Sequence, residues 1–95
     1  MEQLKKKYRF HSDPGHGWLE VTLQELFALG IYDKISRFSY EKEGTIYLEE
    51  DCDAHHFCKA YEEENDEEID FVTIDYNHDA PCKSYARFQT SHNRN

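Results

Sequence analysis

The sequence lacks any long hydrophobic run, and no stretch approaches the ~18 consecutive apolar residues that a membrane-spanning helix needs. It also lacks internal repeats and any linker rich in proline, glycine or serine. Its 95 residues exclude a second domain, a TIM barrel and a complete Rossmann unit. Aromatic residues make up 15% of the chain, whereas disordered chains are poor in them. We therefore expect one small domain over residues 1–88 and a polar, frayed tail over residues 89–95.

Signals for export are absent as well, because no apolar segment follows the polar, basic N-terminus. The chain has three cysteines, Cys52, Cys58 and Cys82, and an odd number cannot be fully paired within one molecule. Both features predict free thiols and a reducing, cytoplasmic location.

Positive charge is scarce in the middle of the chain. The sequence holds 11 Lys and Arg against 20 Asp and Glu, which gives a net charge of -9. The excess lies in residues 41–79, where many acids meet only Lys42 and Lys59 as bases. Such a protein should not bind nucleic acid through phosphates, and an anionic membrane should repel it. A basic surface on another protein should attract it.

The hydrophobic pattern predicts an α+β domain in the order ββαββαββ, with one antiparallel sheet and both helices on one face. Strands are expected at residues 6–11, 17–21, on both sides of Gly44, at 69–76 and at 84–88. Around Gly44, a three-residue turn over 42–44 would place Tyr40, Ile46 and Leu48 on one face, together with Phe38. In the other turn, over 12–15, Pro14 and Gly15 favour a conformation with a positive φ at the glycine.

Helix signals are strongest at residues 21–31. Thr22 and Glu25 form a capping box, and Gly30 suits the left-handed residue that ends many helices. Leu23, Leu26 and Phe27 are expected on the buried face. Asp51 or Asp53 is expected to cap a second helix that runs to about Glu64. In the last two strands, Val72, Ile74 and Tyr76 should share one face, and Ala86 and Phe88 should point inward.

Residue types that bind metals cluster in the second half of the chain. Cys52, His55, His56 and Cys58 lie within seven residues, and Cys82 follows further on. Zinc takes cysteine and histidine ligands, but the paired spacings of known zinc motifs do not occur twice here. Cys58 also lies on the apolar stripe of its helix, which favours a core role. A small metal-binding regulator is therefore the alternative interpretation, and the leading one expects no cofactor.

Motifs for catalysis are missing: the sequence contains no G-x-S-x-G, no H-E-x-x-H and no phosphate-binding loop. The most site-like loop places His16 between two glycines, beside the single tryptophan, Trp18. A tight turn with Trp18 anchored in the core is the simpler interpretation. An enzyme centred on His16 ranks third, and we expect a non-enzymatic protein.

Two acidic clusters bracket the second helix and are the candidate partner-binding residues. They comprise Glu49, Glu50, Asp51 and Asp53 before the helix, and Glu62, Glu63, Glu64, Asp66, Glu67 and Glu68 at its end. A helix rises 1.5 Å per residue, so the separation of the clusters, ~15 Å, spans several phosphates of a duplex. The clusters could therefore occupy a groove lined by lysine and arginine. The alternative is that they only keep the domain soluble, although their mutual repulsion exceeds what solubility requires.

Several strings resemble those of a group of small uncharacterised proteins from bacteriophages and mobile elements: GHGWLEV, LFALGI, ISRFSY, IYLEEDCDA and YARF. The resemblance covers roughly residues 15–88 and assigns no catalytic residue. Small acidic phage proteins often antagonise bacterial defence; anti-CRISPR proteins are among them, and some of these mimic nucleic acid. The resemblance therefore implies a partner among host defence proteins with a basic groove, such as a nuclease or a CRISPR effector.

Overall fold

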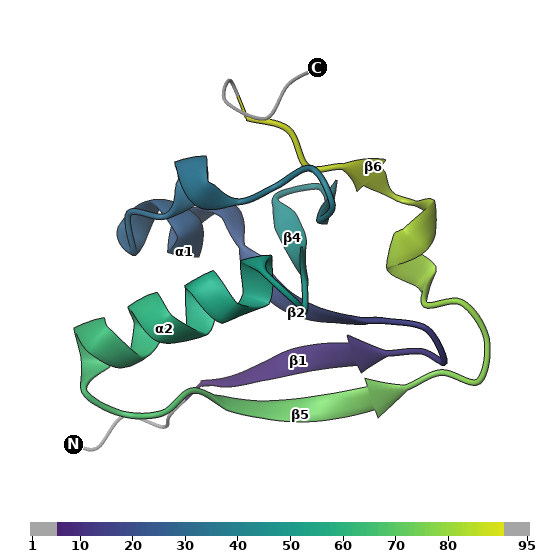
Figure 1. Cartoon of the computed structure of the whole chain (residues 1–95), viewed down its shortest axis with the longest axis horizontal. Helices are drawn as coiled ribbons and strands as arrows, with labels where there is room; N and C mark the ends of the chain where they lie inside the picture. The colour runs from purple at the N-terminus through teal and green to yellow at the C-terminus, as the bar shows by residue number, and fades with distance from the viewer. Residues whose placement is uncertain (1–5, 91–95) are drawn as a thin grey trace.

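A six-stranded sheet organises the chain, and the computed structural model describes residues 6–90 (Figure 1). In spatial order, β5-β1-β2-β4-β3-β6, the strands are β5 (Asp70–Asp75), β1 (Lys7–Ser12), β2 (Gly17–Thr22), β4 (Thr45–Glu49), β3 (Tyr40–Lys42) and β6 (Ala86–Arg87). The helices are α1 (Leu23–Ala28) and α2 (Asp53–Asn65), with short 3-10 helices η1 (Tyr32–Lys34) and η2 (Pro81–Ser84). The predicted α+β class is confirmed, and no helix within residues 6–90 is long and apolar enough to cross a membrane.

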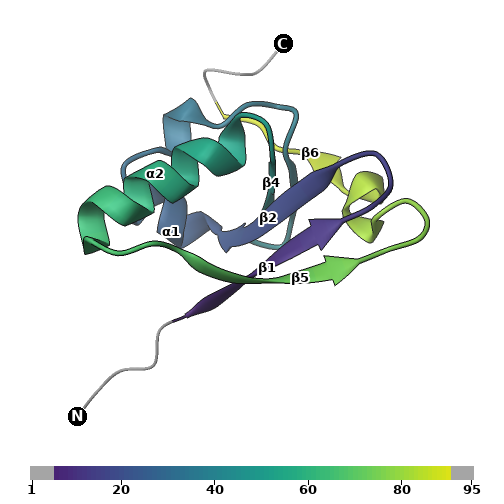
Figure 2. The same ribbon diagram turned by 60° about the horizontal axis from the view of Figure 1, so that its bottom comes forward.

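The sheet is mixed, so the predicted antiparallel sheet was wrong. β5 runs parallel to β1, with Phe71 beside Tyr8 and Ile74 beside His11. The other neighbouring strands are antiparallel. β5 reaches this position because α2 carries the chain from the end of β4 back along the sheet (Figure 2). Alternating apolar residues define which face of a strand is buried, but not the direction in which the strand runs.

Both helices pack on one face of the sheet, as predicted. Tyr8 of β1 and Leu19 of β2 meet Leu26 of α1 and Phe57 of α2 in the main core, which also contains Leu48 of β4. The rings of Tyr8 and Phe57 meet edge to face at 5.5 Å. Tyr8 and Phe10, at alternate positions of β1, both contact this core.

A second core lies on the opposite face of the sheet, and the sequence analysis did not anticipate it. Trp18 and Tyr40 pack there against Ala80 and Cys82, which the segment around η2 supplies. Tyr47 is among the partly buried residues around them. Side chains therefore cover both faces of the central strands, although the two helices cover only one of these faces.

This second core decides the register of the β3–β4 hairpin. Tyr40 pairs with Tyr47, and the two turn residues, Glu43 and Gly44, have φ values of 51° and 84°. Positive φ at both positions is typical of a two-residue type I′ turn. The predicted three-residue turn was wrong because it assumed one buried face, whereas Tyr40 packs on the face opposite Ile46.

The start and end of α1 confirm the sequence signals. The Thr22 hydroxyl accepts the Glu25 amide at 3.1 Å, and the Glu25 carboxylate accepts the Thr22 amide at 2.8 Å. After α1, Gly30 has a φ of 69°, and the amide that follows it donates to the Leu26 carbonyl. Phe27, however, is 58% exposed, because it stacks on Tyr32 outside the core.

Several smaller expectations were also wrong. Cys52, not an aspartate, is the residue before α2, and it caps no backbone group with its side chain. Gly15 does not have a positive φ, whereas Gly30 and Gly44 do. Phe38 and Ala86 are exposed. Phe88 is buried as expected.

The start of the predicted tail is ordered by packing. Thr90 is 1% exposed, so the packed part of the chain continues beyond residue 88. The Phe88 amide donates to the Ser39 carbonyl at 2.8 Å, which ties this segment to the loop before β3. The remainder of the predicted tail, residues 91–95, lies outside the described residues.

Candidate functional site

The second acidic cluster is a surface feature, as the sequence suggested. All six of its carboxylate residues are exposed, at the end of α2 and in the loop that leads to β5: Glu62, Glu63, Glu64, Asp66, Glu67 and Glu68. Asp66 ends α2 in a left-handed conformation with a φ of 53°. This cluster therefore occupies a turn between the helix and the edge of the sheet (Figure 1).

The first acidic cluster is divided between surface and interior. Glu50 and Asp51 are exposed, but Asp53 is 0% exposed. Its carboxylate accepts the Ser36 amide at 3.1 Å and the hydroxyls of Ser36 and Ser39 at 2.7 and 2.6 Å. Asp53 therefore fastens the loop before β3 to the start of α2, and its prediction as a partner-binding residue was wrong.

Glu49 is half-buried and also has a structural role. Its carboxylate accepts the amides of Asp51 and Cys52 at 2.9 and 3.0 Å. These amides precede α2, where backbone donors have no partner within the helix. The cluster thus contributes Glu50 and Asp51 to the surface, while Glu49 and Asp53 organise the start of the helix.

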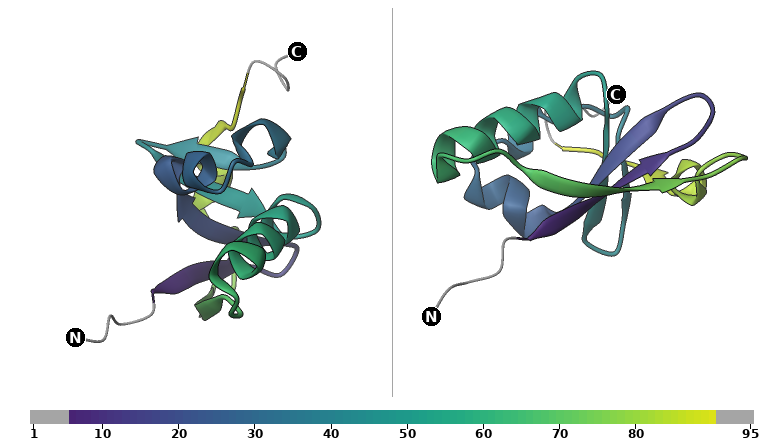
Figure 3. Two further views of the ribbon diagram at one scale, coloured as in Figure 1. Left: turned by 90° about the vertical axis from the view of Figure 1, so that its left-hand side faces the viewer. Right: turned by 90° about the horizontal axis from the view of Figure 1, so that it is seen from below.

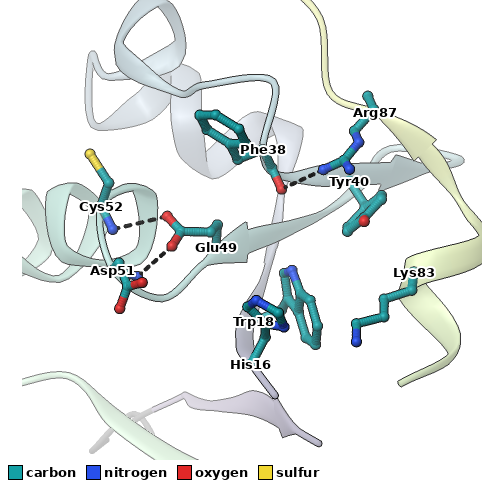
Figure 4. A pocket seen from close by; sticks show the side chains of 9 residues that line it. All are labelled: His16, Trp18, Phe38, Tyr40, Glu49, Asp51, Cys52, Lys83 and Arg87. Carbon is teal, nitrogen blue, oxygen red and sulfur yellow. Dashed lines mark hydrogen bonds between the residues drawn. The ribbon is translucent and has the colours of Figure 1, made fainter. Parts of the chain in front are cut away.

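A pocket with a volume of about 490 Å³ lies on the sheet face opposite the helices (Figure 4). Its lining comes from segments far apart in the sequence: His16, Trp18, Phe38, Tyr40, Glu49, Asp51, Cys52, Lys83 and Arg87. Trp18 and Tyr40 are buried, whereas Phe38 is 66% exposed. This volume is within the range of small-molecule sites.

Two cations lie on one side of the pocket, and only one of them has carboxylate partners. Lys83 Nζ lies 3.1 Å from carboxylate oxygens of both Asp13 and Asp79. The Arg87 guanidinium lies 4.6 Å from the centre of the Tyr40 ring and donates to the Phe38 carbonyl at 3.3 Å. Within residues 6–90, no carboxylate pairs with Arg87. Its charge is therefore available to an anion that enters the pocket.

Asp13 fixes the loop that carries His16. Its side chain accepts the amides of Gly15, His16 and Ala80 at 2.8 to 2.9 Å and pairs with Lys83. These donors, the Ala80 amide first, hold the pKa of the Asp13 carboxyl far below its usual range. The His16 ring lies 5.7 Å from the Trp18 ring, but within the described residues no hydrogen bond joins it to Cys52 or to a carboxylate. The loop is thus held firmly, without a nucleophile–base pair.

The candidate metal ligands are not brought together. Cys52 and His55 are exposed, Cys58 packs against the main core, and Cys82 belongs to the core on the other face of the sheet. Among residues 6–90, no three histidine, cysteine or acidic side chains could hold a metal ion. Burial raises the pKa of the Cys82 thiol to about 12 and also raises the pKa of Cys58, which disfavours the thiolate that zinc would need.

Sequence reasoning identified His16 and Trp18 but missed Tyr40, Lys83 and Arg87 as neighbours of that loop. Tyr40 and Tyr47, which lie on the sheet face opposite the main core, could have indicated the second core. No local pattern in the sequence points to Lys83 or Arg87. No family model matches the chain, and neither curated proteins nor solved structures give a match. The function is therefore inferred from the residues and their geometry.

Proposed function

We propose that this chain is a non-enzymatic protein that binds a basic surface of another protein and blocks it. The observation that carries the proposal is the density of exposed carboxylates after the middle of α2. Residues 62–75 hold eight acidic side chains and no lysine or arginine. Adjacent like charges repel one another and destabilise the compact state, so their concentration in one segment favours a role in binding over general solubility.

The blocked surface is proposed to be one that binds nucleic acid. Carboxylates along the end of α2 are spaced by 1.5 Å of helix rise per residue, close to the ~1.7 Å per charge of a DNA duplex. A groove that neutralises phosphates with lysine and arginine should therefore accept this surface. The resemblance to phage and mobile-element proteins directs the proposal to a host defence protein, such as a nuclease or a CRISPR effector, in the bacterial cytoplasm.

The test compares two variants with the same change in charge. Glu63→Gln combined with Glu64→Gln removes two carboxylates from the end of α2. Glu41→Gln combined with Glu43→Gln removes two at the β3–β4 hairpin, outside both acidic clusters. Purified nucleases and CRISPR effectors are titrated with each protein at low and at physiological salt, and both binding and nucleic-acid cleavage are measured.

The α2 variant should bind several-fold more weakly than the wild type, mainly because association is slower. This difference should shrink as salt screens the charges, since the Debye length falls to about 8 Å at physiological ionic strength. The hairpin variant should bind and inhibit like the wild type. Equal affinity of all three proteins at both salt concentrations would contradict the proposal.

A second candidate function, binding of a small ring-bearing anion, is favoured by Arg87 at the pocket. Aromatic walls suit a planar ring, and the arginine, which has no carboxylate partner among residues 6–90, suits an acid group on it. Nucleoside monophosphates and aromatic carboxylates, titrated against the fluorescence of Trp18, test this function. Arg87→Gln should abolish any saturable change, whereas Glu43→Gln should not alter it.

A further inference from the structure

β5 forms a long, open edge of the sheet. It is six residues long and outermost, and within residues 6–90 no strand pairs with its outer side (Figures 1 and 3). The strand at the opposite edge, β6, is only two residues long. Natural proteins protect such edges with charged side chains, especially lysine, or with proline, bulges or short strands. Of these features β5 has only the aspartates at its two ends, and its Phe71 and Val72 are 50% and 49% exposed.

The outward backbone groups of β5 can be assigned from its pairing. The Tyr76 amide donates to the Ser12 carbonyl of β1 at 2.8 Å. Alternate residues of a strand direct their N–H and C=O groups to opposite sides. Val72 and Ile74 therefore face β1 with Tyr76, whereas Phe71, Thr73 and Asp75 direct theirs outward. The edge thus offers three residues whose donors and acceptors can pair with a further strand.

The charge around this edge has a single sign. The exposed cluster Glu62–Glu68 leads directly into β5, which itself begins with Asp70 and ends with Asp75. We propose that β5 is the docking edge for a basic β-strand of a partner protein, which extends the sheet while its lysine and arginine side chains meet these carboxylates. This inference rests on the proposed function and specifies how the basic partner is held. Main-chain hydrogen bonds supply affinity in this mode of recognition.

A second copy of this chain is a poor occupant of the same edge. The molecule carries a net charge of -9. A parallel pairing of two β5 strands would bring the two acidic clusters alongside each other, and an antiparallel pairing would bring Asp70 of each copy toward Asp75 of the other. Like charges placed close together across paired strands are destabilising. The lysine and arginine side chains of a basic strand would instead attract the carboxylates of this segment. The charge of the edge therefore favours a different protein over a second copy.

The experiment uses a short synthetic peptide of alternating lysine and valine as the probe. Its control is the same peptide with alternate backbone nitrogens methylated, which keeps the charge but prevents strand pairing. Binding is followed by NMR hydrogen exchange of the full chain. The unmodified peptide should slow exchange of the amides of Phe71, Thr73 and Asp75, with little effect on Gly30, which lies beyond α1.

Two variants complete the test. Thr73→Pro removes an outward N–H and should abolish this protection, since proline is tolerated at a strand edge. Thr73→Ala keeps the N–H and should bind the peptide like the wild type. A change in the far-ultraviolet circular dichroism of Thr73→Pro would show misfolding, in which case the protection pattern of the wild type decides the test.

The outcomes separate this inference from the proposed function. Equal binding of the methylated and unmodified peptides, or protection confined to other amides, would overturn strand addition and leave an electrostatic contact with a basic partner. Loss of binding in the Glu63→Gln and Glu64→Gln variant, together with unchanged binding in Thr73→Pro, would likewise overturn strand addition alone. Absence of binding by both peptides at low salt would count against both proposals.

Discussion

Replacing Asp53 by asparagine should destabilise the protein strongly, although the two side chains have nearly the same size. The hydroxyls of Ser36 and Ser39 both donate to one carboxylate oxygen of Asp53. Each hydroxyl also accepts a backbone amide, that of Phe38 at 3.1 Å and that of Glu49 at 3.0 Å. The direction of both hydroxyl bonds is therefore fixed. An asparagine that keeps its oxygen toward the two hydroxyls turns its NH₂ group toward the Ser36 amide, which donates to the other carboxylate oxygen at 3.1 Å, so a donor then faces a donor.

The expected loss has two parts. A hydrogen bond to a charged group contributes about 1.5–3 kcal/mol and one to a neutral group about 0.5–1.5 kcal/mol, so the two hydroxyl bonds together weaken by about 2 kcal/mol. A buried donor left without an acceptor costs about 1–3 kcal/mol more, which gives a total of roughly 3 kcal/mol or more. A domain of this length has a total stability of about 5–14 kcal/mol. Each kcal/mol lowers the melting temperature by about 4–8 °C at this size, which gives a fall of roughly 12–24 °C for Asp53→Asn.

Thermal unfolding followed by circular dichroism measures this effect. Asp51→Asn is the matched control, because it makes the same chemical change at an exposed carboxylate two residues away. Its free energy of unfolding should stay within about 0.5 kcal/mol of the wild type. If Asp53→Asn melts within about 2 °C of the wild type, the carboxylate does not carry the network described above, and Asp53 returns to the set of surface candidates.

Three further predictions concern the hairpin, the thiols and the loop before β2. Gly44→Val should cost about 1–3 kcal/mol in thermal unfolding, because a β-branched residue resists the φ of 84°; an unchanged melting curve would rule out the two-residue turn. At about pH 8, a thiol reagent should modify exposed Cys52 in the native protein, but buried Cys82, with its pKa of about 12, only after unfolding. Asp13 has a lowered pKa, so its stabilisation is complete above the unfolded value of about 4 and is lost as pH falls below it. Melting temperatures measured at a series of pH values should show this loss in the wild type, and Asp13→Asn should reduce it.

The helix α1 illustrates what short-range information could predict. Its capping box, its glycine with a positive φ and its buried Leu26 all depend on residues within one or two helical turns. The alternation of β1 was equally accessible, because Tyr8 and Phe10 share one face in any sheet arrangement. The acidic cluster at 62–68 was also correctly placed at the surface, since adjacent carboxylates are rarely buried.

The candidate pocket could be predicted only in part. His16 and Trp18 are close in the sequence and stood out as a loop, but the residues that surround them come from β3, η2 and β6. Both acidic clusters consist of aspartate and glutamate, yet Asp53 of the first cluster is buried. Its burial depends on Ser36 and Ser39, which are separated from it by a hairpin, so no local pattern distinguishes it from its exposed neighbours.

The sequence by itself determined the α+β class, the ends of α1, the buried face of β1 and the acidic surface after α2, because each follows from interactions between residues close together in the chain. Only the tertiary structure decided the parallel direction of β5, the turn at Gly44, the second core around Trp18 and the burial of Asp53. Each of these depends on contacts between distant segments, and a side chain is buried or exposed according to what the rest of the chain places against it.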